Sequence, residues 1–78
     1  MREKHQYIII TFHTTSEAMA MEKLCTHMGI PGRLIPVPRE ITAGCGLSWR
    51  VKKEDFSLYQ EKMKDLEVEH DQVVELML

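Results

Sequence analysis

A cysteine between two glycines, in the segment Ala43-Gly44-Cys45-Gly46, is the residue best placed to do chemistry in this chain. Glycine carries no side chain, so Gly44 and Gly46 leave the backbone around Cys45 open to a partner or a ligand. An exposed thiol near a helix N-terminus and basic side chains, of which Arg39 is one candidate, readily forms the thiolate, which is both a nucleophile and a metal ligand. The segment therefore predicts a reactive thiol at Cys45. The alternative is a tight turn in which Cys45 is a small, semi-buried side chain.

The second cysteine and the histidines give no comparable indication of a site. Cys25 follows Met21 and precedes Met28 at helical spacing, so we expect a buried thiol that packs like a small hydrophobic side chain. A zinc site needs several Cys, His or carboxylate ligands that converge in space, and the chain has no Cys-x-x-Cys pair. We therefore expect no metal and no cofactor. We interpret each of the four histidines as a surface residue instead of a metal ligand: His5, His13, His27 and His70.

Three hydroxyl side chains, Thr14, Thr15 and Ser16, stand where the first helix is expected to begin. Together with the free backbone N–H groups of a helix N-terminus, they could hold an anion. Thr14 with Glu17 also fits a capping box, which is enough to explain the hydroxyls without a ligand. Arg39 also has two interpretations. It could contact a bound anion, or it could form an ion pair with Glu40, the next residue in the sequence.

Hydrophobic periodicity and turn residues predict six elements around these groups. A run rich in β-branched residues predicts a central strand at 7–13, covered on both faces. Apolar positions at three- and four-residue spacing predict a helix after Thr14 that Gly29 ends. Strict alternation predicts a strand at 47–51, with Trp49 toward one face of the sheet and Arg50 toward the other. The remaining elements are a short strand at 32–35, a helix from about 54 with an apolar stripe (Phe56, Tyr59, Met63 and Leu66), and a strand at 73–77.

The order strand, helix, strand, strand, helix, strand predicts a single α+β domain over residues 1–78. The natural packing is the ferredoxin-like βαββαβ arrangement, a four-stranded antiparallel sheet with both helices on one face. Pro36 and Pro38 cannot donate to a sheet, so the second strand belongs at an edge. In this topology the turn at 13–16 and the loop at 36–46 lie at the same end of the sheet. We therefore expect Cys45 to face the N-terminus of the first helix, with His13 close by.

Composition limits the classes of partner. Ten Lys and Arg against twelve Asp and Glu give a formal net charge of −2, whereas proteins that bind nucleic acid or anionic membranes carry a basic surplus. No apolar run is long enough to cross a bilayer, and no signal-peptide core follows the first residues. Two cysteines are few for a secreted domain of this size, so we expect a cytoplasmic protein with reduced thiols. If the sheet face without helices is apolar, a homodimer could form through it.

The stretch from Gly32 to Arg50 resembles a known family. It contains Pro36-Val37-Pro38-Arg39-Glu40-Ile41 followed by Cys45-Gly46-Leu47, and the similarity extends upstream to cover most of residues 7–51. This pattern is similar to that of a small bacterial family described as putative selenium/sulfur carrier protein-like. The resemblance implies one functional cysteine, Cys45, in a protein that works beside the enzymes of selenium and sulfur trafficking.

These expectations lead to a carrier. Cys45 would take sulfur or selenium from a desulfurase-like donor enzyme as a persulfide or selenopersulfide and pass it to an acceptor protein, with Arg39 and the helix N-terminus stabilising the terminal anion. Such a carrier is not an enzyme in the strict sense. One alternative is a ferredoxin-like regulatory or small-anion-binding module in which Cys45 is dispensable. The other is a thiol enzyme or redox adaptor, for which His13 is the candidate base.

Overall fold

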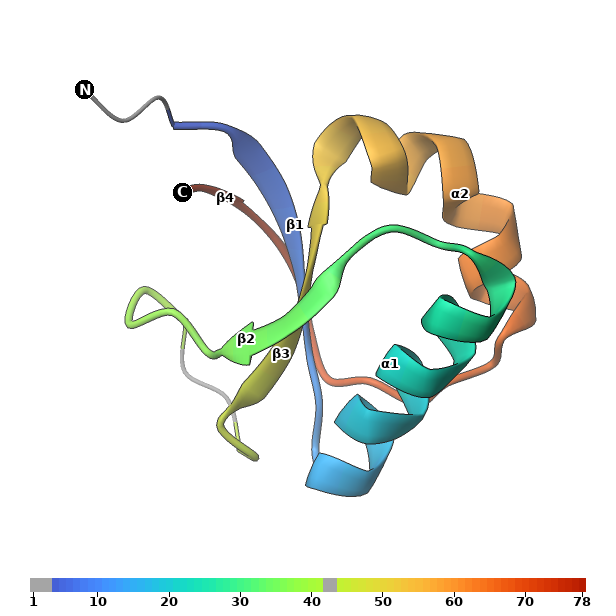
Figure 1. The fold of residues 1–78 in the computed structure, drawn as a ribbon. Helices are drawn as coiled ribbons and strands as arrows, with labels where there is room; N and C mark the ends of the chain where they lie inside the picture. Colours follow the sequence, from blue (N-terminus) through green and yellow to red (C-terminus); the bar gives the residue numbers. More distant parts are fainter. Residues whose placement is uncertain (1–3, 42–43) are drawn as a thin grey trace.

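Six secondary-structure elements make up the fold (Figure 1). The computed structural model describes residues 4–41 and 44–78. The elements follow one another in the expected order, and their bounds are β1 (Gln6–Thr11), α1 (Thr15–Met28), β2 (Arg33–Pro36), β3 (Leu47–Lys52), α2 (Lys53–Asp65) and β4 (Val73–Met77). Neither α1 nor α2, the helices of the described residues, is long and apolar enough to cross a membrane.

The four strands form one antiparallel sheet in the order β2-β3-β1-β4. Both helices lie on the same face of this sheet (Figure 1). The ferredoxin-like α+β fold is thereby confirmed, with β2 at an edge as its prolines predict. β1 lies between β3 and β4, so that Ile10 stands opposite Trp49 on one side and Val73 on the other. The first and last strands of the fold are therefore neighbours.

The ends of α1 lie where the sequence predicts them. Thr14 is the N-cap: its Oγ1 accepts a hydrogen bond from the Glu17 N–H at 3.2 Å. The Glu17 carboxylate in turn accepts hydrogen bonds from the N–H groups of His13 (2.8 Å) and Thr14 (3.4 Å), which completes a capping box. Gly29 ends the helix in the left-handed conformation, with a φ of 71°. The capping box therefore fixes the helix N-terminus and places a carboxylate there.

Replacing Thr14 with alanine should lower the free energy of unfolding by about 1 kcal/mol, because the Glu17 N–H loses its acceptor. Urea unfolding followed by circular dichroism measures the change. Thr15→Ala is the matched control, since Thr15 is exposed and lies inside the first turn; it should change the free energy by less than about 0.5 kcal/mol. Equal losses in the two variants would contradict the assignment of Thr14 as the cap.

The main core lies between the sheet and the two helices. Trp49 is one of its largest side chains and is only 2% exposed. Gly32, just before β2, lies against the indole: a Cβ built on Gly32 would come within 2.6 Å of three indole atoms. Of the apolar stripe predicted for α2, Met63 is buried, and the half-buried members are Phe56, Tyr59 and Leu66. The core therefore depends on a close approach of backbone to a tryptophan ring, as well as on the apolar faces of the helices.

The face of the sheet without helices is covered at its centre. Ile9 lies on this face between Arg50 and Val74, and it is fully buried. The loop after β2 runs on the same side of the sheet (Figure 1), and its Ile41 is buried as well. Arg50 points to this face as predicted, with its guanidinium 4.6 Å from the centre of the Tyr7 ring. The chain thus covers much of this face itself, and a homodimer through it stays a prediction.

Candidate functional site

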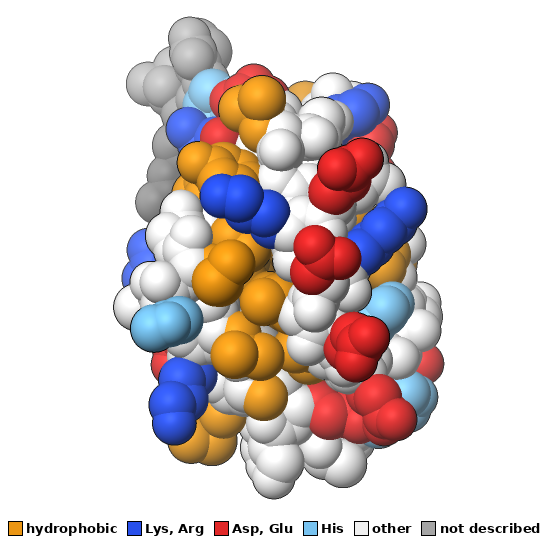
Figure 2. Space-filling view, turned by 90° about the vertical axis from the view of Figure 1, so that its right-hand side faces the viewer, with side chains coloured by type: hydrophobic (Ala, Val, Ile, Leu, Met, Phe, Trp, Pro, Cys, Tyr) orange, Lys and Arg blue, Asp and Glu red, His pale blue; other side chains and the backbone are white. Residues whose placement is uncertain are grey.

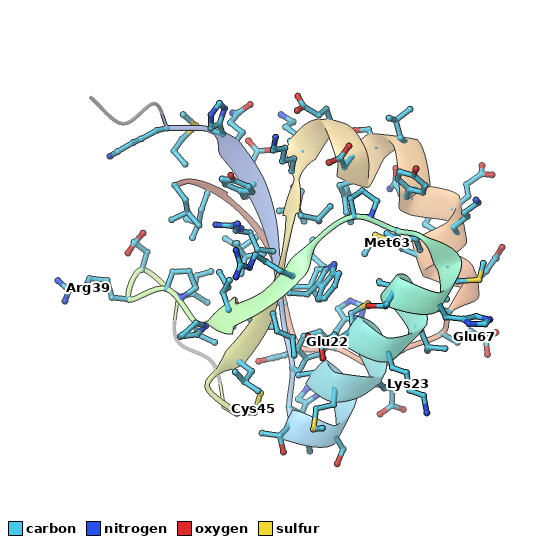
Figure 3. The ribbon with its side chains drawn as sticks, in the orientation of Figure 1. Glu22, Lys23, Arg39, Cys45, Met63 and Glu67 are labelled. Atoms are coloured by element: carbon cyan, nitrogen blue, oxygen red, sulfur yellow. The ribbon has the colours of Figure 1, made fainter. Side chains whose placement is uncertain are left out.

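Cys45 lies in the turn that leads into β3 (Figure 3). The next residue, Gly46, has a φ of 83°, a left-handed conformation that favours glycine. The Cys45 side chain is half-buried at the margin of the main core, and its thiol donates a hydrogen bond to the Leu47 carbonyl oxygen at 3.4 Å. The thiol is thus only partly exposed, whereas the sequence predicts an exposed one for a reactive cysteine. A thiolate cannot donate a hydrogen bond, so the side chain must give up the Leu47 contact when it reacts.

The loop that carries Cys45 meets the N-terminal end of α1, as the topology predicts. β1 and β2 run in the same direction, since each pairs antiparallel to β3. A Cβ on Gly44 would lie 3.8 Å from the His13 carbonyl oxygen, and Figure 3 shows Cys45 beside the first turn of α1. Two segments that are distant in the sequence therefore meet at one end of the sheet.

The His13 side chain faces two carboxylates. Its Nδ1 lies 3.4 Å from Glu17 Oε1, and its Nε2 lies 3.6 Å from Asp71 Oδ1. Asp71 is held in place because its N–H donates a hydrogen bond to the Thr11 carbonyl oxygen at 2.7 Å. Both ring nitrogens of His13 thus face carboxylates, and the Cys45 thiol bonds to the Leu47 carbonyl oxygen instead of to this ring, so these contacts give no support to His13 as the base of a thiol enzyme. Sequence reasoning missed Asp71, since no local pattern connects it to His13.

The N-terminus of α1 already holds a negative charge. Burial around Glu17 raises the pKa of its carboxyl, but the backbone N–H groups of His13 and Thr14 and the His13 side chain outweigh this and leave the pKa below its usual value. Thr14 is engaged in the cap, whereas Thr15 and Ser16 are exposed in the first turn. The capping interpretation is therefore confirmed, and an anion held by Thr15 and Ser16 stays a prediction.

Arg39 lies on the far side of its loop from the thiol. It is exposed in the turn at 39–40 and points outward, away from Cys45 (Figure 3). Residues 42 and 43, which belong to the loop expected to frame Cys45, lie outside the described residues. The structure does not bring Arg39 and the thiol together, and a contact from Arg39 to a bound anion stays a prediction.

Cys25 is a core thiol, as its helical spacing predicts. It is fully buried, and its Sγ lies 3.5 Å from the Met21 Sδ. Burial raises the pKa of the Cys25 thiol to about 11. Within residues 4–41 and 44–78, no group of three or more His, Cys, Asp or Glu side chains could hold a metal ion. Of the two thiols, Cys45 is the less buried.

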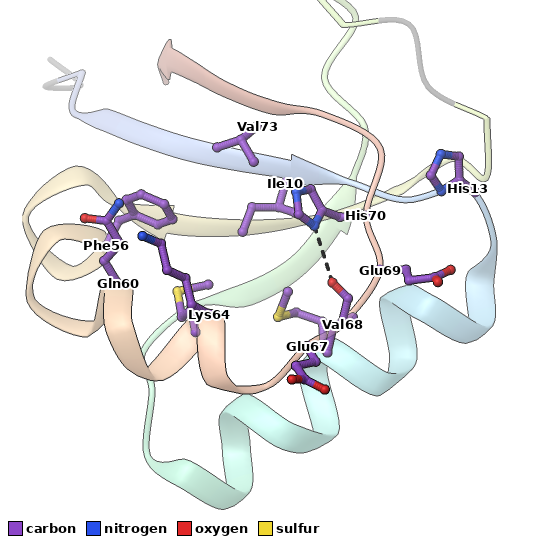
Figure 4. A pocket seen from close by; sticks show the side chains of 12 residues that line it. Ile10, His13, Phe56, Gln60, Lys64, Glu67, Val68, Glu69, His70 and Val73 are labelled. Carbon is purple, nitrogen blue, oxygen red and sulfur yellow. Dashed lines mark hydrogen bonds between the residues drawn. The ribbon is translucent and has the colours of Figure 1, made fainter.

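A cleft of about 590 Å³ lies between α2, β1 and the segment that joins α2 to β4, and sequence reasoning did not find it (Figure 4). We call it the α2 cleft. Its rim carries Lys64, Glu67, Glu69 and His70, with His13 at one end. Periodicity predicts Phe56 and Met63 as buried residues but gives no sign that the space beside them stays open. The apolar residues that line the cleft are Ile10, Met21, Phe56, Met63, Val68 and Val73.

Comparison with known proteins connects the chain with a family. A family model described as putative Se/S carrier protein-like matches residues 7–75. The matched range includes both helices, the turn with Cys45 and most of the sheet. No curated protein and no solved structure matches the chain.

Proposed function

The chain belongs to the putative Se/S carrier protein-like family, and from that premise we propose that it carries sulfur or selenium on the Cys45 side chain. It takes the atom from a donor enzyme and releases it to an acceptor protein. The observation that carries this proposal is the contrast between the two thiols. Cys25 is fully buried in the core, whereas Cys45 is half-buried in a glycine-flanked turn at the end of the sheet.

Transfer to Cys45 is an exchange at a sulfur–sulfur bond and needs no external oxidant. The Cys45 thiol loses its proton to solvent, and the thiolate attacks the outer sulfur of a persulfide on the donor enzyme. The bond between this sulfur and the donor cysteine breaks, and the electron pair leaves with the donor thiolate. The product is a persulfide on Cys45, which a nucleophile of the acceptor attacks in the same way. For selenium, the outer atom of the donor is selenium in a selenopersulfide, and the balance is the same.

The surroundings of Cys45 support such an exchange through access. Gly44 and Gly46 have no side chains that would block the approach of a partner's active site. The hydrogen bond to the Leu47 carbonyl oxygen is weak, and Cys45 is packed only at the margin of the core, so the side chain can turn toward a partner without disturbing the buried residues. Thr15 and Ser16, exposed in the neighbouring first turn of α1, are the polar groups available to the terminal anion.

Intact-mass spectrometry tests the proposal. The full chain is incubated with a cysteine desulfurase and cysteine, or with a selenocysteine lyase and selenocysteine. We expect a mass gain of one sulfur or one selenium atom, which a reductant removes. Because Cys45 holds the cargo, Cys45→Ser should abolish the adduct.

Cys25→Ala is the matched control, since it removes the other thiol and should leave the adduct in place. Sodium polysulfide serves as a donor that needs no docking. An adduct that survives in Cys45→Ser would contradict the assignment of the carrier residue. No adduct with the desulfurase, the lyase or polysulfide would contradict the carrier function itself.

A further inference from the structure

β4 is an edge strand, and the backbone groups of every second residue face away from the sheet. His5 and Leu78 exchange both backbone hydrogen bonds, at 2.9 and 3.0 Å, which sets the alternation of the ladder between β1 and β4. By this alternation, Leu76 and Val74 also bond to β1. The N–H and C=O groups that point outward from the sheet are therefore those of Val73, Glu75 and Met77.

The side chains of the same three residues lie on the helix face of the sheet. Val73 stands opposite Ile10, which belongs to the main core on that face. The helices pack mainly over β1, β2 and β3 and leave β4 largely uncovered, so Val73 is 49% exposed and Met77 is 50% exposed. Val73 also lines the α2 cleft (Figure 4). A strand added along β4 would thus extend the sheet and place its side chains beside an apolar cleft.

The rim of the α2 cleft is acidic. The segment between α2 and β4 carries Glu67, Glu69 and Asp71, which are all exposed, whereas Lys64 is the basic residue of the lining. Figure 2, which looks onto the helices, shows a band of hydrophobic side chains with acidic ones along one flank and basic ones among them. A segment that fits the cleft therefore needs apolar side chains for its lining and positive charge for its rim.

We propose that β4 and the α2 cleft form a docking site for an extended segment of a partner protein that carries apolar and basic residues on the same face of the strand. The segment adds as a strand along β4 and bonds to the outward groups of Val73, Glu75 and Met77. One of its apolar side chains lies over the mouth of the cleft, beside Val73, and its basic side chains pair with Glu67 and Glu69. Backbone bonding gives the orientation, and the acidic rim selects the charge.

A second copy of this chain does not have the chemistry for the site. β4 has one charged residue, Glu75, whose carboxylate pairs with the Lys53 ammonium at 3.1 Å, so a second β4 supplies no positive charge of its own for the rim. The other sheet edge, β2, carries Arg33, but Pro36 ends it. Joining β2 of one copy to β4 of the next is a head-to-tail contact between different surfaces, which does not close into a dimer. The occupant is therefore a different protein.

The docking site continues toward the turn that carries the thiol. His13 lines one end of the α2 cleft, and its carbonyl oxygen is the group that Gly44 approaches. A segment docked on β4 would hold the rest of its protein near Cys45. That the partner is the sulfur or selenium donor rests on the proposed carrier function, whereas strand addition on β4 does not depend on it.

Peptide binding to the full chain tests the docking site. The probe is a short capped peptide in which every second residue is valine or lysine, with threonine between them, so that valine and lysine share one face of the strand. It is titrated into ¹⁵N-labelled protein. It should shift the amide signals of the α2 cleft and of Val73, Glu75 and Met77, and slow hydrogen exchange at these three amides. A peptide with glutamate in place of lysine, or one with N-methyl groups on its bonding edge, should bind at least about tenfold more weakly. Shifts confined to another face, or equal affinity for all three peptides, would overturn the proposal.

Two pairs of variants separate the backbone and charge contributions. Glu75→Pro removes an outward N–H but no bond to β1, and it should weaken binding of the lysine peptide at least about tenfold. Glu75→Gln keeps the N–H and should stay within about threefold of the parent. Glu67→Lys should also weaken binding of the lysine peptide at least about tenfold. Glu22→Lys is the same change at an exposed position of α1 outside the cleft lining, and it should leave binding unchanged. If Glu75→Pro fails to fold, the comparison of Glu67→Lys with Glu22→Lys decides, and equal affinities in that pair count against the site.

Loading of Cys45 distinguishes failure of the docking site from failure of the carrier function. Glu67→Lys should take sulfur from polysulfide like the parent chain but slow transfer from the desulfurase. Unchanged transfer from the desulfurase would overturn docking of the donor at this site and leave the carrier function standing. If polysulfide adds no sulfur to Cys45 of the parent chain, the result counts against the carrier function. Strand addition on β4, which the peptide titration tests, would still stand.

Discussion

Gly32→Ala is expected to lower the free energy of unfolding by about 3 kcal/mol, because the new methyl group has no space and the backbone no suitable conformation. Its Cβ would come within 2.6 Å of three indole atoms of Trp49, and the indole is 2% exposed, so it has little room to move. Gly32 also has a φ of 145°, which residues with a side chain rarely adopt. Urea unfolding followed by the fluorescence of Trp49, the one tryptophan of the chain, measures the change.

Gly29→Ala is the matched control for this effect. Gly29 also has a positive φ, of 71°, but nothing lies within 4 Å of the position of its Cβ. The control should therefore cost about 1 kcal/mol, the price of the backbone conformation alone. A loss in Gly32→Ala no larger than that in Gly29→Ala would show that the indole moves aside, and would contradict the close packing of Gly32 on Trp49.

Alkylation of the native chain at pH 8 should modify Cys45 and leave Cys25 intact. Cys25 is fully buried, and burial raises the pKa of its thiol to about 11. At pH 8, therefore, only about one Cys25 side chain in a thousand is in the thiolate form. Iodoacetamide followed by peptide mass spectrometry should find one adduct in buffer and two in denaturant. Rapid modification of both thiols in buffer would contradict the burial of Cys25.

The same burial makes stability depend on pH above 9. The pKa of Cys25 is raised in the folded chain from an ordinary value of 9.0 to about 11, so the folded state keeps a proton that the unfolded state loses. The stabilising contribution of Cys25 to the free energy of unfolding is fully present below pH 9. It is lost as the pH rises toward 11, at about 1.4 kcal/mol per pH unit. Cys25→Ala should lack this part of the slope. Parallel stability curves for the parent chain and Cys25→Ala between pH 9 and 11 would contradict the shift.

Features that depend on local chemistry could be predicted from the sequence. Thr14 and Glu17 form the capping box and Gly29 ends the helix because these choices are made within one turn of chain. Pro36 sends β2 to an edge because it lacks a donor, whatever its neighbours are. The meeting of Gly44 with His13 also follows, since the direction of each strand is fixed by the order of the elements.

Features that depend on side chains from distant elements could not be predicted in this way. The approach of Asp71 to His13 requires β1 and β4 to be neighbours, and no spacing in the sequence records the distance between their side chains. The half-burial of Cys45 has the same origin: glycines on both sides indicate an open turn, but the margin of the core and the Leu47 carbonyl oxygen cover part of the thiol. The α2 cleft is open because α2 does not reach over β4, which periodicity cannot show.

The pairing of His5 with Leu78 has a practical consequence for engineering the chain. The two hydrogen bonds between these residues hold the described ends of the chain side by side (Figure 1). They lie at the opposite end of β1 from His13, and therefore away from the turn with Cys45. A purification tag or fluorescent fusion before His5 should therefore leave the turn with Cys45 uncovered. A short linker between the ends should give a circular permutant, with new termini in the exposed turn at 39–40, that folds to the same sheet.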